Sequence, residues 1–303
     1  MKRKCLLFAL VLALFLTGCS LPGPETTVPT QPPQTLPSET QPPTTESTQP
    51  TQILQPVPED GDFVRVLDYI PDIVVDLRYA TEDNFTGQRI YAFRELWLRY
   101  ATVQKLMAVQ QSLKERGLYL KVWDGFRPTS AQFTLWSVCP DPTYVSNPNI
   151  GFSSHSRGNT VDVTLVTADG KEIAMPTDFD DFSHLADRDY SDCPPEAAAN
   201  AMLLERVMAE NGFTPYSGEW WHFSDTQSFP VADNFEPIDI TRYKAQCNEF
   251  ISLRTEPDAS ADVIAKIPVG EEFQVLAFWG DFALVEYQGL RGYVLRSYTV
   301  PAS

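Results

Sequence analysis

Apolar residues recur at helical spacing in three stretches of this 303-residue chain. The clearest stretch is 96–116, where Leu106, Val109 and Leu113 share one helical face and Gly117 follows as a stop signal. We therefore predict a helix there. Two shorter helices are predicted at 130–137 and at 195–211.

Between these helices, alternation of apolar and polar residues predicts strands. In 160–166, Val161, Val163 and Leu165 form one apolar face, which places Asp162 and Thr164 on the other face, away from the expected core. The irregular order of strands and helices favours an α+β fold, with a small, mainly antiparallel sheet and flanking helices. The other strands are predicted within 63–78, at 119–123 and at 220–223.

From about residue 248 the pattern changes to short strands that are separated by Pro, Gly and Asp turns. The abrupt switch predicts a separate, compact all-β module rather than an extension of the first domain. Its strands are expected at 251–254, 263–267, 273–278, 282–287 and 291–295.

The N-terminal residues have the layout of an export signal. A basic start at residues 2–4 precedes an apolar run that ends in Leu16-Thr17-Gly18-Cys19, and this run is too short to span a membrane. The ending resembles a bacterial lipobox, which implies lipidation of Cys19, a lipid anchor and an extracytoplasmic location. A plain cleaved signal is the alternative. Residues 19–58 hold eleven of the 25 prolines and are predicted to be a linker.

The predicted organisation is therefore a signal peptide at 1–18, lipidated Cys19 with a linker at 19–58, a first domain at 59–240 and a second at 246–303. The formal net charge of −17 becomes −20 once Lys2, Arg3 and Lys4 leave with the signal. So acidic a chain argues against binding to nucleic acid. After lipidation of Cys19, the cysteines of the folded part are Cys139, Cys193 and Cys247, and the sequence does not choose among their pairings.

The chain contains only three histidines, and two of them lie in short polar motifs. His155 and Asp162 belong to SSHSRGNTVD, whereas His222 belongs to EWWHF. Zinc prefers imidazole nitrogen and carboxylate oxygen, and a catalytic zinc keeps three protein ligands and one open position. We therefore predict one Zn²⁺ per chain, held by these three residues. The alternative for His222 taken alone is a packed core histidine.

Glu219 is the predicted general base. It precedes His222 by three residues, a spacing that would send the two side chains to opposite faces of a regular strand. Ser217-Gly218 predicts a turn just before them, so that Glu219 lies at the entrance of the strand, where alternation fails. There the carboxylate can take a proton from water.

Arg127 lies in a predicted turn at 124–128, directly after a strand. A fixed guanidinium can stabilise the negative charge that develops on oxygen during peptide hydrolysis. The alternative is a surface arginine paired with Asp124. His184 lies in an acidic stretch and is predicted to be a loop histidine rather than a metal ligand.

Four ordered motifs between residues 63 and 230 resemble the VanX-type D-alanyl-D-alanine dipeptidases, a group of zinc D,D-peptidases that act on cell-wall peptides. They are YATEDNFTG, WDGFRP, SSHSRGNTVDVTL and YSGEWWHF. The resemblance implies the same zinc ligands, Glu219 as base and Arg127 as the group that stabilises the transition state. It also implies substrate contacts from Tyr79, Ser153 and Asp180, with Asp180 holding the ammonium group of a free dipeptide.

The C-terminal module resembles bacterial SH3-like domains through SLRTEPDASADVIAKIPVGEEFQVL and the later Gly-Tyr-Val. This resemblance implies binding to peptidoglycan. Trp279, Tyr287 and Tyr293 either line a groove of this module or belong to its core.

Together these features predict a zinc-dependent hydrolase that cleaves D-alanyl-D-alanine to D-alanine at the outer face of a bacterial membrane. The segment between Arg127 and His155 is shorter than in relatives with an insertion there, which leaves open a D,D-carboxypeptidase that trims longer stem peptides. A non-catalytic wall-binding lipoprotein is the third interpretation.

Overall fold

The structure, a computed structural model, describes residues 57–142 and 144–302. The predicted signal peptide, lipidated Cys19 and nearly all of the predicted linker lie outside these residues. Within the described ranges, no helix combines the length and the apolar character that a membrane crossing requires.

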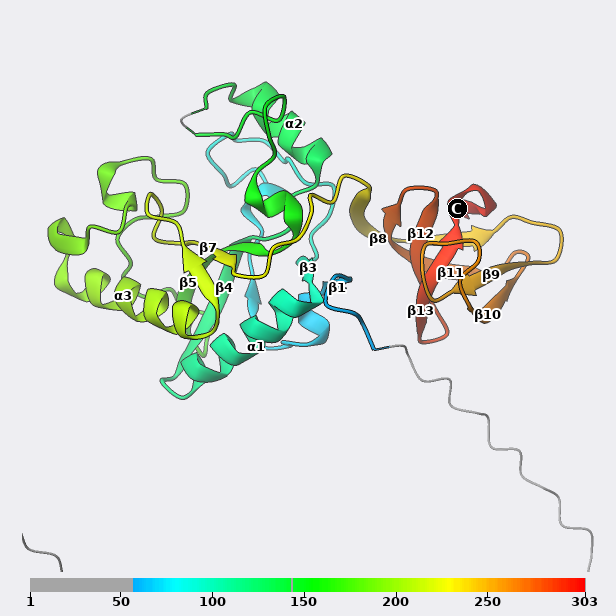
Figure 1. Cartoon of the computed structure of the whole chain (residues 1–303), viewed down its shortest axis with the longest axis horizontal. Coiled ribbons are helices and arrows are strands. Elements are labelled where there is room, and N and C mark those ends of the chain that lie inside the picture. The colour runs from blue at the N-terminus through cyan, green and yellow to red at the C-terminus, as the bar shows by residue number, and fades with distance from the viewer. Residues whose placement is uncertain (1–56, 143, 303) are drawn as a thin grey trace, which may run out of the picture. The chain divides into compact units, whose positions relative to one another are not determined.

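The first region is built on a five-stranded sheet with the strand order β2-β4-β5-β7-β6 (Figure 1). All neighbouring strands in it are antiparallel except β2 and β4, so the predicted mainly antiparallel α+β fold is confirmed. A separate antiparallel pair joins β1 to β3. The bounds are β1 Phe63–Arg65, β2 Val74–Val75, β3 Trp97–Arg99, β4 Leu118–Asp124, β5 Thr160–Thr167, β6 Phe213–Pro215 and β7 His222–Asp225.

Three α-helices accompany this sheet: α1 (Tyr100–Lys114), α2 (Thr129–Val138) and α3 (Pro195–Glu210). Helices α1 and α3 contact each other, and they pack against β4 and β5 respectively (Figure 1). Their apolar faces, which include Leu106 and Leu204, are fully buried. This burial, rather than helix propensity, holds the two helices on the sheet.

The predicted helix at 96–116 begins too early. Residues 97–99 form β3 and pair with β1, and only from Tyr100 does the chain turn helical. The reason is that Leu96, Trp97 and Leu98 are all buried, so this short apolar run carries no helical periodicity. The strand predicted at 220–223 begins two residues later, at His222.

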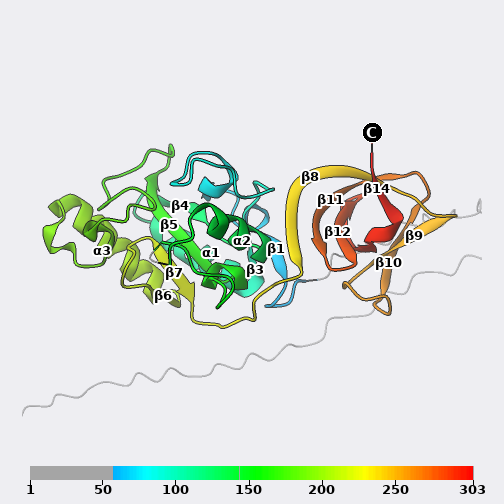
Figure 2. The same ribbon diagram turned by 90° about the horizontal axis from the view of Figure 1, so that it is seen from above.

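The C-terminal module is a seven-stranded antiparallel sheet with the order β10-β9-β13-β12-β11-β8-β14, which curls on itself in Figure 2. The expected all-β class is confirmed. Strand β8 was not predicted, because it contains a buried proline, Pro237, and several charged residues that are only partly buried or exposed. The strand runs across residue 240. The bounds are β8 Phe235–Ala245, β9 Phe250–Arg254, β10 Val263–Pro268, β11 Glu272–Trp279, β12 Phe282–Tyr287, β13 Leu290–Leu295 and β14 Thr299–Pro301.

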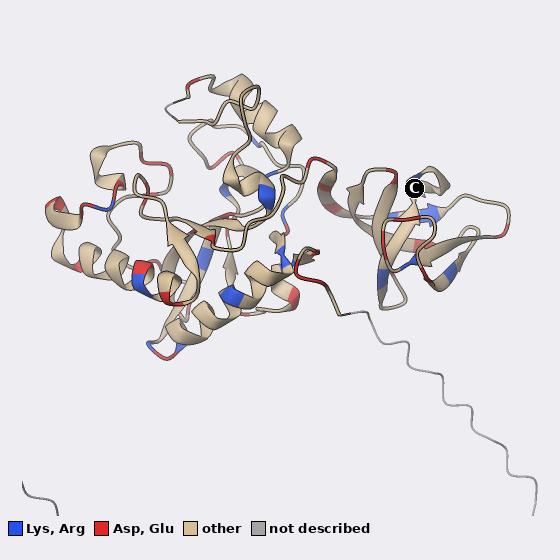
Figure 3. Ribbon diagram, in the orientation of Figure 1, with Lys and Arg blue, Asp and Glu red and all other residues tan. Residues whose placement is uncertain are grey.

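Tyr287 belongs to the buried core of this module, while Trp279 and Tyr293 are half-buried. Acidic residues are spread over the loops and helices of the described chain, with Lys and Arg interspersed among them (Figure 3). The negative charge is therefore distributed over the chain.

Gly158 ends the short 3-10 helix η3 (Ser154–Arg157) with φ of 77°. A Cβ added there would lie 2.4 Å from the ring of buried Phe63. We expect Gly158→Ala to lower the free energy of unfolding by about 3 kcal/mol, which combines the cost of the left-handed conformation with overpacking. Urea denaturation followed by tryptophan fluorescence would measure this loss.

Gly170→Ala is the matched control, since Gly170 has φ of 78° but no atom within 4 Å of the added Cβ. It should cost only about 1 kcal/mol, the conformational part alone. Equal losses in the two variants would contradict the packing argument.

Candidate active site

Three strands place ionisable side chains in one row across the sheet. The register pairs Asp124 at the end of β4 with Asp162 on β5, and pairs Asp162 with His222 at the start of β7. Directly opposed residues of antiparallel strands point to the same face. The register of β4 shifts between Val122 and Asp124, a bulge of the kind that re-aims side chains beside functional sites.

Both faces of β5 are buried, which corrects the prediction that Asp162 and Thr164 point away from the core. Their exposed fractions are 4% and 2%. Asp162 is therefore a carboxylate inside the protein, where a charge is stable only beside a compensating charge or a set of hydrogen bonds.

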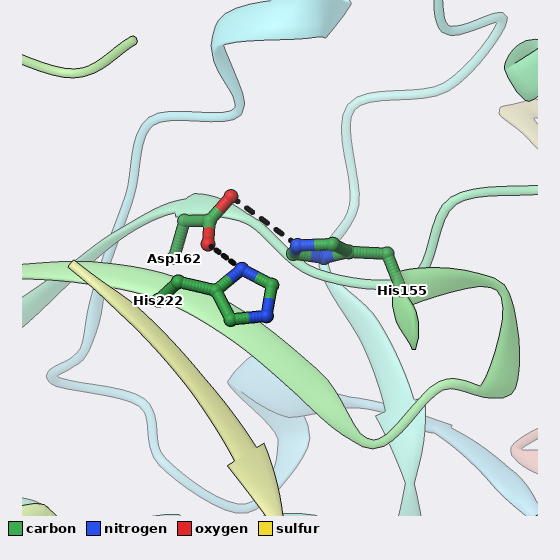
Figure 4. A group of neighbouring side chains, drawn as sticks. All are labelled: His155, Asp162 and His222. Carbon is green, nitrogen blue, oxygen red and sulfur yellow. Dashed lines mark ion pairs between the residues drawn. The ribbon is translucent and has the colours of Figure 1, made fainter. Parts of the chain in front are cut away.

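His155, Asp162 and His222 form a compact cluster in which both imidazole rings face the carboxylate (Figure 4). The distance from His155 Nε2 to Asp162 Oδ2 is 3.3 Å, and that from His222 Nδ1 to Asp162 Oδ1 is 3.0 Å. Their ligand atoms all lie within 4.8 Å of one another. Two imidazoles and one carboxylate are the donor set that zinc prefers in catalytic sites.

The hydrogen bonding of His155 fits a cation at this point. Its Nδ1 lies 2.8 Å from the carbonyl oxygen of Gly125, which can only accept, so Nδ1 carries the proton in the neutral ring. Nε2 is then a lone-pair donor that faces the oxygen of Asp162. In addition, Asp162 Oδ1 is buried without a hydrogen bond of good geometry, although His222 Nδ1 is close to it. A cation bound between these atoms would remove the opposition of the lone pairs.

The electrostatics of the cluster agree with this conclusion. Burial alone lowers the pKa of His155, but Asp162 and Asp124 raise it, and the net pKa lies above the usual value. Burial alone raises the pKa of Asp162. His155 and His222 lower it by more than burial raises it, so the net pKa of Asp162 lies below the usual value. The cluster therefore favours an ionised carboxylate beside a positive charge.

Glu219 lies in the turn that precedes β7, as the Ser217-Gly218 signal predicts. Its backbone N–H donates to the carbonyl of Tyr216, and its Oε2 lies 3.5 Å from His222 Nδ1. Its pKa is raised, first by burial and then by the charge of Asp162. A carboxyl group with a raised pKa, beside a metal cluster, is suited to accept and return a proton near neutral pH.

Arg127 is buried rather than on the surface, although it does pair with Asp124. Its Nη2 lies 2.7 Å from Asp124 Oδ2, its Nη1 donates to Gln132 Oε1 at 3.1 Å, and its Nε lies 3.4 Å from the Tyr91 hydroxyl. Burial lowers the pKa of Arg127, but Asp124 raises it more, so the guanidinium stays charged. The fixed cation faces the same cavity as Glu219.

Of the three buried residues that support Arg127, two were not identified from the sequence, Tyr91 and Gln132. Asp124 accepts hydrogen bonds from the Tyr91 hydroxyl at 2.6 Å and from the Gly125 amide at 2.8 Å, and Gln132 donates to the Ser146 carbonyl at 2.7 Å. Asp124 was named from the sequence as a partner of Arg127, because both lie in the predicted turn at 124–128. Tyr91 and Gln132 carry no such signal, since only the tertiary fold brings them to the guanidinium.

Tyr79 and Asp180 lie together, as the resemblance implies. The Tyr79 hydroxyl donates to Asp180 Oδ2 at 2.8 Å, and the Tyr79 ring lies under the Arg127 guanidinium at 5.1 Å. Asp180 adopts φ of 55°, a strained conformation for a residue with a side chain. Burial raises the pKa of Asp180 to about 7, which a ligand cation beside it would lower again. Ser153 caps η3 and accepts from the His155 amide at 3.4 Å.

All eight predicted catalytic, metal-binding and substrate-binding residues line one cavity of about 370 Å³. His184 does not: it is 78% exposed and pairs with Asp192. Cys139, Cys193 and Cys247 are all free thiols in the structure. The other residues around the cavity are Leu135, Pro142, Tyr144, Val145, Ser146, Ser154, Phe182 and Tyr216.

Comparison with known proteins gives two family matches. A profile described as D-ala-D-ala dipeptidase matches residues 59–241, and one described as bacterial SH3 domain matches 249–300. The D-alanyl-D-alanine dipeptidase of Escherichia coli (strain K12) is 38% identical over 168 residues, 54% of this chain and 86% of the relative. The D-alanyl-D-alanine dipeptidase of Streptomyces coelicolor is 35% identical over 200 residues, which cover 57% of this chain and 99% of the relative. The D-alanyl-D-alanine dipeptidase of Enterococcus faecium is 32% identical over 168 residues, which cover 49% of this chain and 83% of the relative.

We expect His222→Ala to abolish retention of zinc, because it removes one of three ligands, whereas the wild-type chain retains one Zn²⁺. Elemental analysis after dialysis would measure the metal content. Free Zn²⁺ at a thousandfold excess over Kd should also raise the free energy of unfolding of the wild type by about 4 kcal/mol.

His184→Ala is the matched control, since it removes an exposed histidine outside the cavity. It should retain the metal and the stabilisation. Loss of zinc from both variants, or from neither, would refute the assignment of the site.

Proposed function

The chain belongs to the D-Ala-D-Ala dipeptidase family, and from that premise we propose that it is a zinc-dependent enzyme that hydrolyses D-alanyl-D-alanine to two molecules of D-alanine. The observation that carries the proposal is the cluster of His155, Asp162 and His222, with Glu219 beside it in one cavity. A binding protein without activity has no need of a fourth, base-like carboxyl group at a metal cluster. This argues against the scaffold interpretation.

Zinc held by these three residues would polarise the scissile carbonyl and make water a better nucleophile. Glu219 accepts a proton from the attacking water as the new C–O bond forms. The C–N bond then breaks, and Glu219 returns that proton to the leaving amine. The proton count balances, because the water supplies the hydroxyl of one product and the hydrogen of the other.

Arg127 stabilises the oxygen on which negative charge develops. Its cation is already oriented by Asp124 and Gln132, so little reorganisation accompanies the reaction. Asp124 also prevents the guanidinium from being an uncompensated buried charge, which would be strongly destabilising.

Asp180 and Tyr79 bind the ammonium group of the dipeptide in this proposal. Without a ligand, the raised pKa of Asp180 keeps a large share of this carboxyl neutral near pH 7. A bound ammonium would favour the ionised form and form an ion pair with it. A stem peptide has an amide at that nitrogen and therefore lacks this interaction, so the pair favours the free dipeptide.

We expect Glu219→Gln to reduce kcat for D-alanine release from D-Ala-D-Ala by about 10²–10⁴-fold, the usual contribution of a general acid–base group. Zinc content should not change, because the ligands remain. A coupled assay for D-alanine, run with and without a chelator, measures the activity.

Glu210→Gln, an exposed change at the end of α3, is the control and should keep full activity. Wild-type kcat in Glu219→Gln would refute the proposed base. Release from a pentapeptide but not from the dipeptide would favour the D,D-carboxypeptidase, and no zinc-dependent release from either would favour the scaffold.

The proposed location is the outer face of the membrane, with Cys19 lipidated and the C-terminal module bound to peptidoglycan. The lipobox-like Leu16-Thr17-Gly18-Cys19 supports the anchor, and the match to bacterial SH3 domains supports the wall contact. Two acyl chains suffice for stable membrane attachment.

We expect Cys19→Ala to lose incorporation of labelled fatty acid and to leave the membrane fraction. Cys5→Ala, which changes a cysteine within the same N-terminal segment, should keep both. Acylation of Cys19→Ala would show that the lipid is attached elsewhere.

A further inference from the structure

Three aromatic residues from separate loops meet at the mouth of the cavity. The Phe182 ring contacts the Tyr144 ring, with centroids 4.4 Å apart, and the Phe85 ring, with centroids 5.2 Å apart. Phe182 and Tyr144 line the cavity, yet they are 43% and 46% exposed, which places them at its rim. We call Phe85, Tyr144 and Phe182 the aromatic clasp.

The clasp is tied to the predicted ammonium site. Phe182 follows Asp180 by two residues, and Phe85 packs edge-on against Tyr79, whose hydroxyl holds Asp180. Between Asp180 and the core, Phe179 is fixed by ring contacts with Trp123 and Trp221. Phe179 thus anchors to the core the segment that carries Asp180 and Phe182.

We infer that the aromatic clasp is a specificity determinant, which closes the cavity beyond the ammonium site and restricts the enzyme to free dipeptides. This inference rests on the proposed function. A dipeptide ends at its ammonium group, whereas a stem peptide continues from that nitrogen through an amide. Its next residue needs the space at the rim where the rings of Phe182 and Tyr144 are in contact, so a longer substrate must separate them.

The short segment between Arg127 and His155 contributes a side chain to this rim. Tyr144 reaches from that segment to Phe182, and the two walls of the cavity meet through their side chains. The selectivity is therefore carried by side chains, and a single truncation should relax it.

The test compares kcat/KM for D-Ala-D-Ala with kcat/KM for a pentapeptide that ends in D-Ala-D-Ala, using the full zinc-loaded chain. We expect Phe182→Ala to raise the ratio of pentapeptide to dipeptide activity by about tenfold, the scale of one aromatic pair. Phe182→Tyr, which keeps the ring, should retain the wild-type ratio.

Phe133→Ala is the matched control, because Phe133 is 47% exposed and contacts Phe152 but does not line the cavity. Its ratio should equal that of the wild type. An unchanged ratio in Phe182→Ala, an equal loss for both substrates, or a wild type that cleaves the pentapeptide as readily as the dipeptide would overturn the inference.

Calorimetric titration can measure the same selectivity through binding affinity, without turnover. The dipeptide and the pentapeptide are each titrated into the Glu219→Gln protein, with and without Phe182→Ala. Tight binding of the dipeptide together with a Phe182-dependent exclusion of the pentapeptide supports the clasp even if hydrolysis fails. Dipeptide hydrolysis without that dependence refutes only the clasp, whereas binding of neither peptide refutes the proposed function as well.

Discussion

The active site depends on one register of three strands, which aligns Asp124, Asp162 and His222 in a row. Two buried carboxylates as neighbours would repel each other, and the site is stable because each has its own partner charge. Asp124 pairs with Arg127, while Asp162 faces two imidazoles. A shift of one residue in β5 would turn Asp162 to the other face and separate all three.

The turn that follows β4 serves both halves of the site. Its Gly125 carbonyl fixes the proton of His155 on Nδ1, and its Asp124 carboxylate fixes the orientation of Arg127. Metal ligation and charge stabilisation thus share one backbone segment, in which a side chain at Gly125 would meet Leu96 at 2.3 Å. The relative position of the His155 ring and the Arg127 guanidinium is therefore held by one short backbone segment through a hydrogen bond and an ion pair.

The sequence predicts the chemistry of this site better than its architecture. With only three histidines in the chain, the choice of His155 and His222 was strongly limited, and the family resemblance is confirmed by the matches to known dipeptidases. The bulge before Asp124, the buried role of Gln132 and the start of α1 at Tyr100 depend on contacts between distant segments. Strand β8 escaped prediction because its exposed, charged positions lack a clear alternation. The roles of the individual site residues stay predictions until variants are measured.

The length of one segment does not by itself decide substrate access. A short segment between Arg127 and His155 suggests an open cavity, because fewer residues are present to cover it. In the structure, Tyr144 extends from this segment to contact Phe182, and we propose that this pair of rings takes the part of a longer loop. A side chain also closes a cavity at a smaller cost in chain entropy than an ordered loop. The proposed selectivity is therefore better sought in the rim residues than in the length of the segment that carries them.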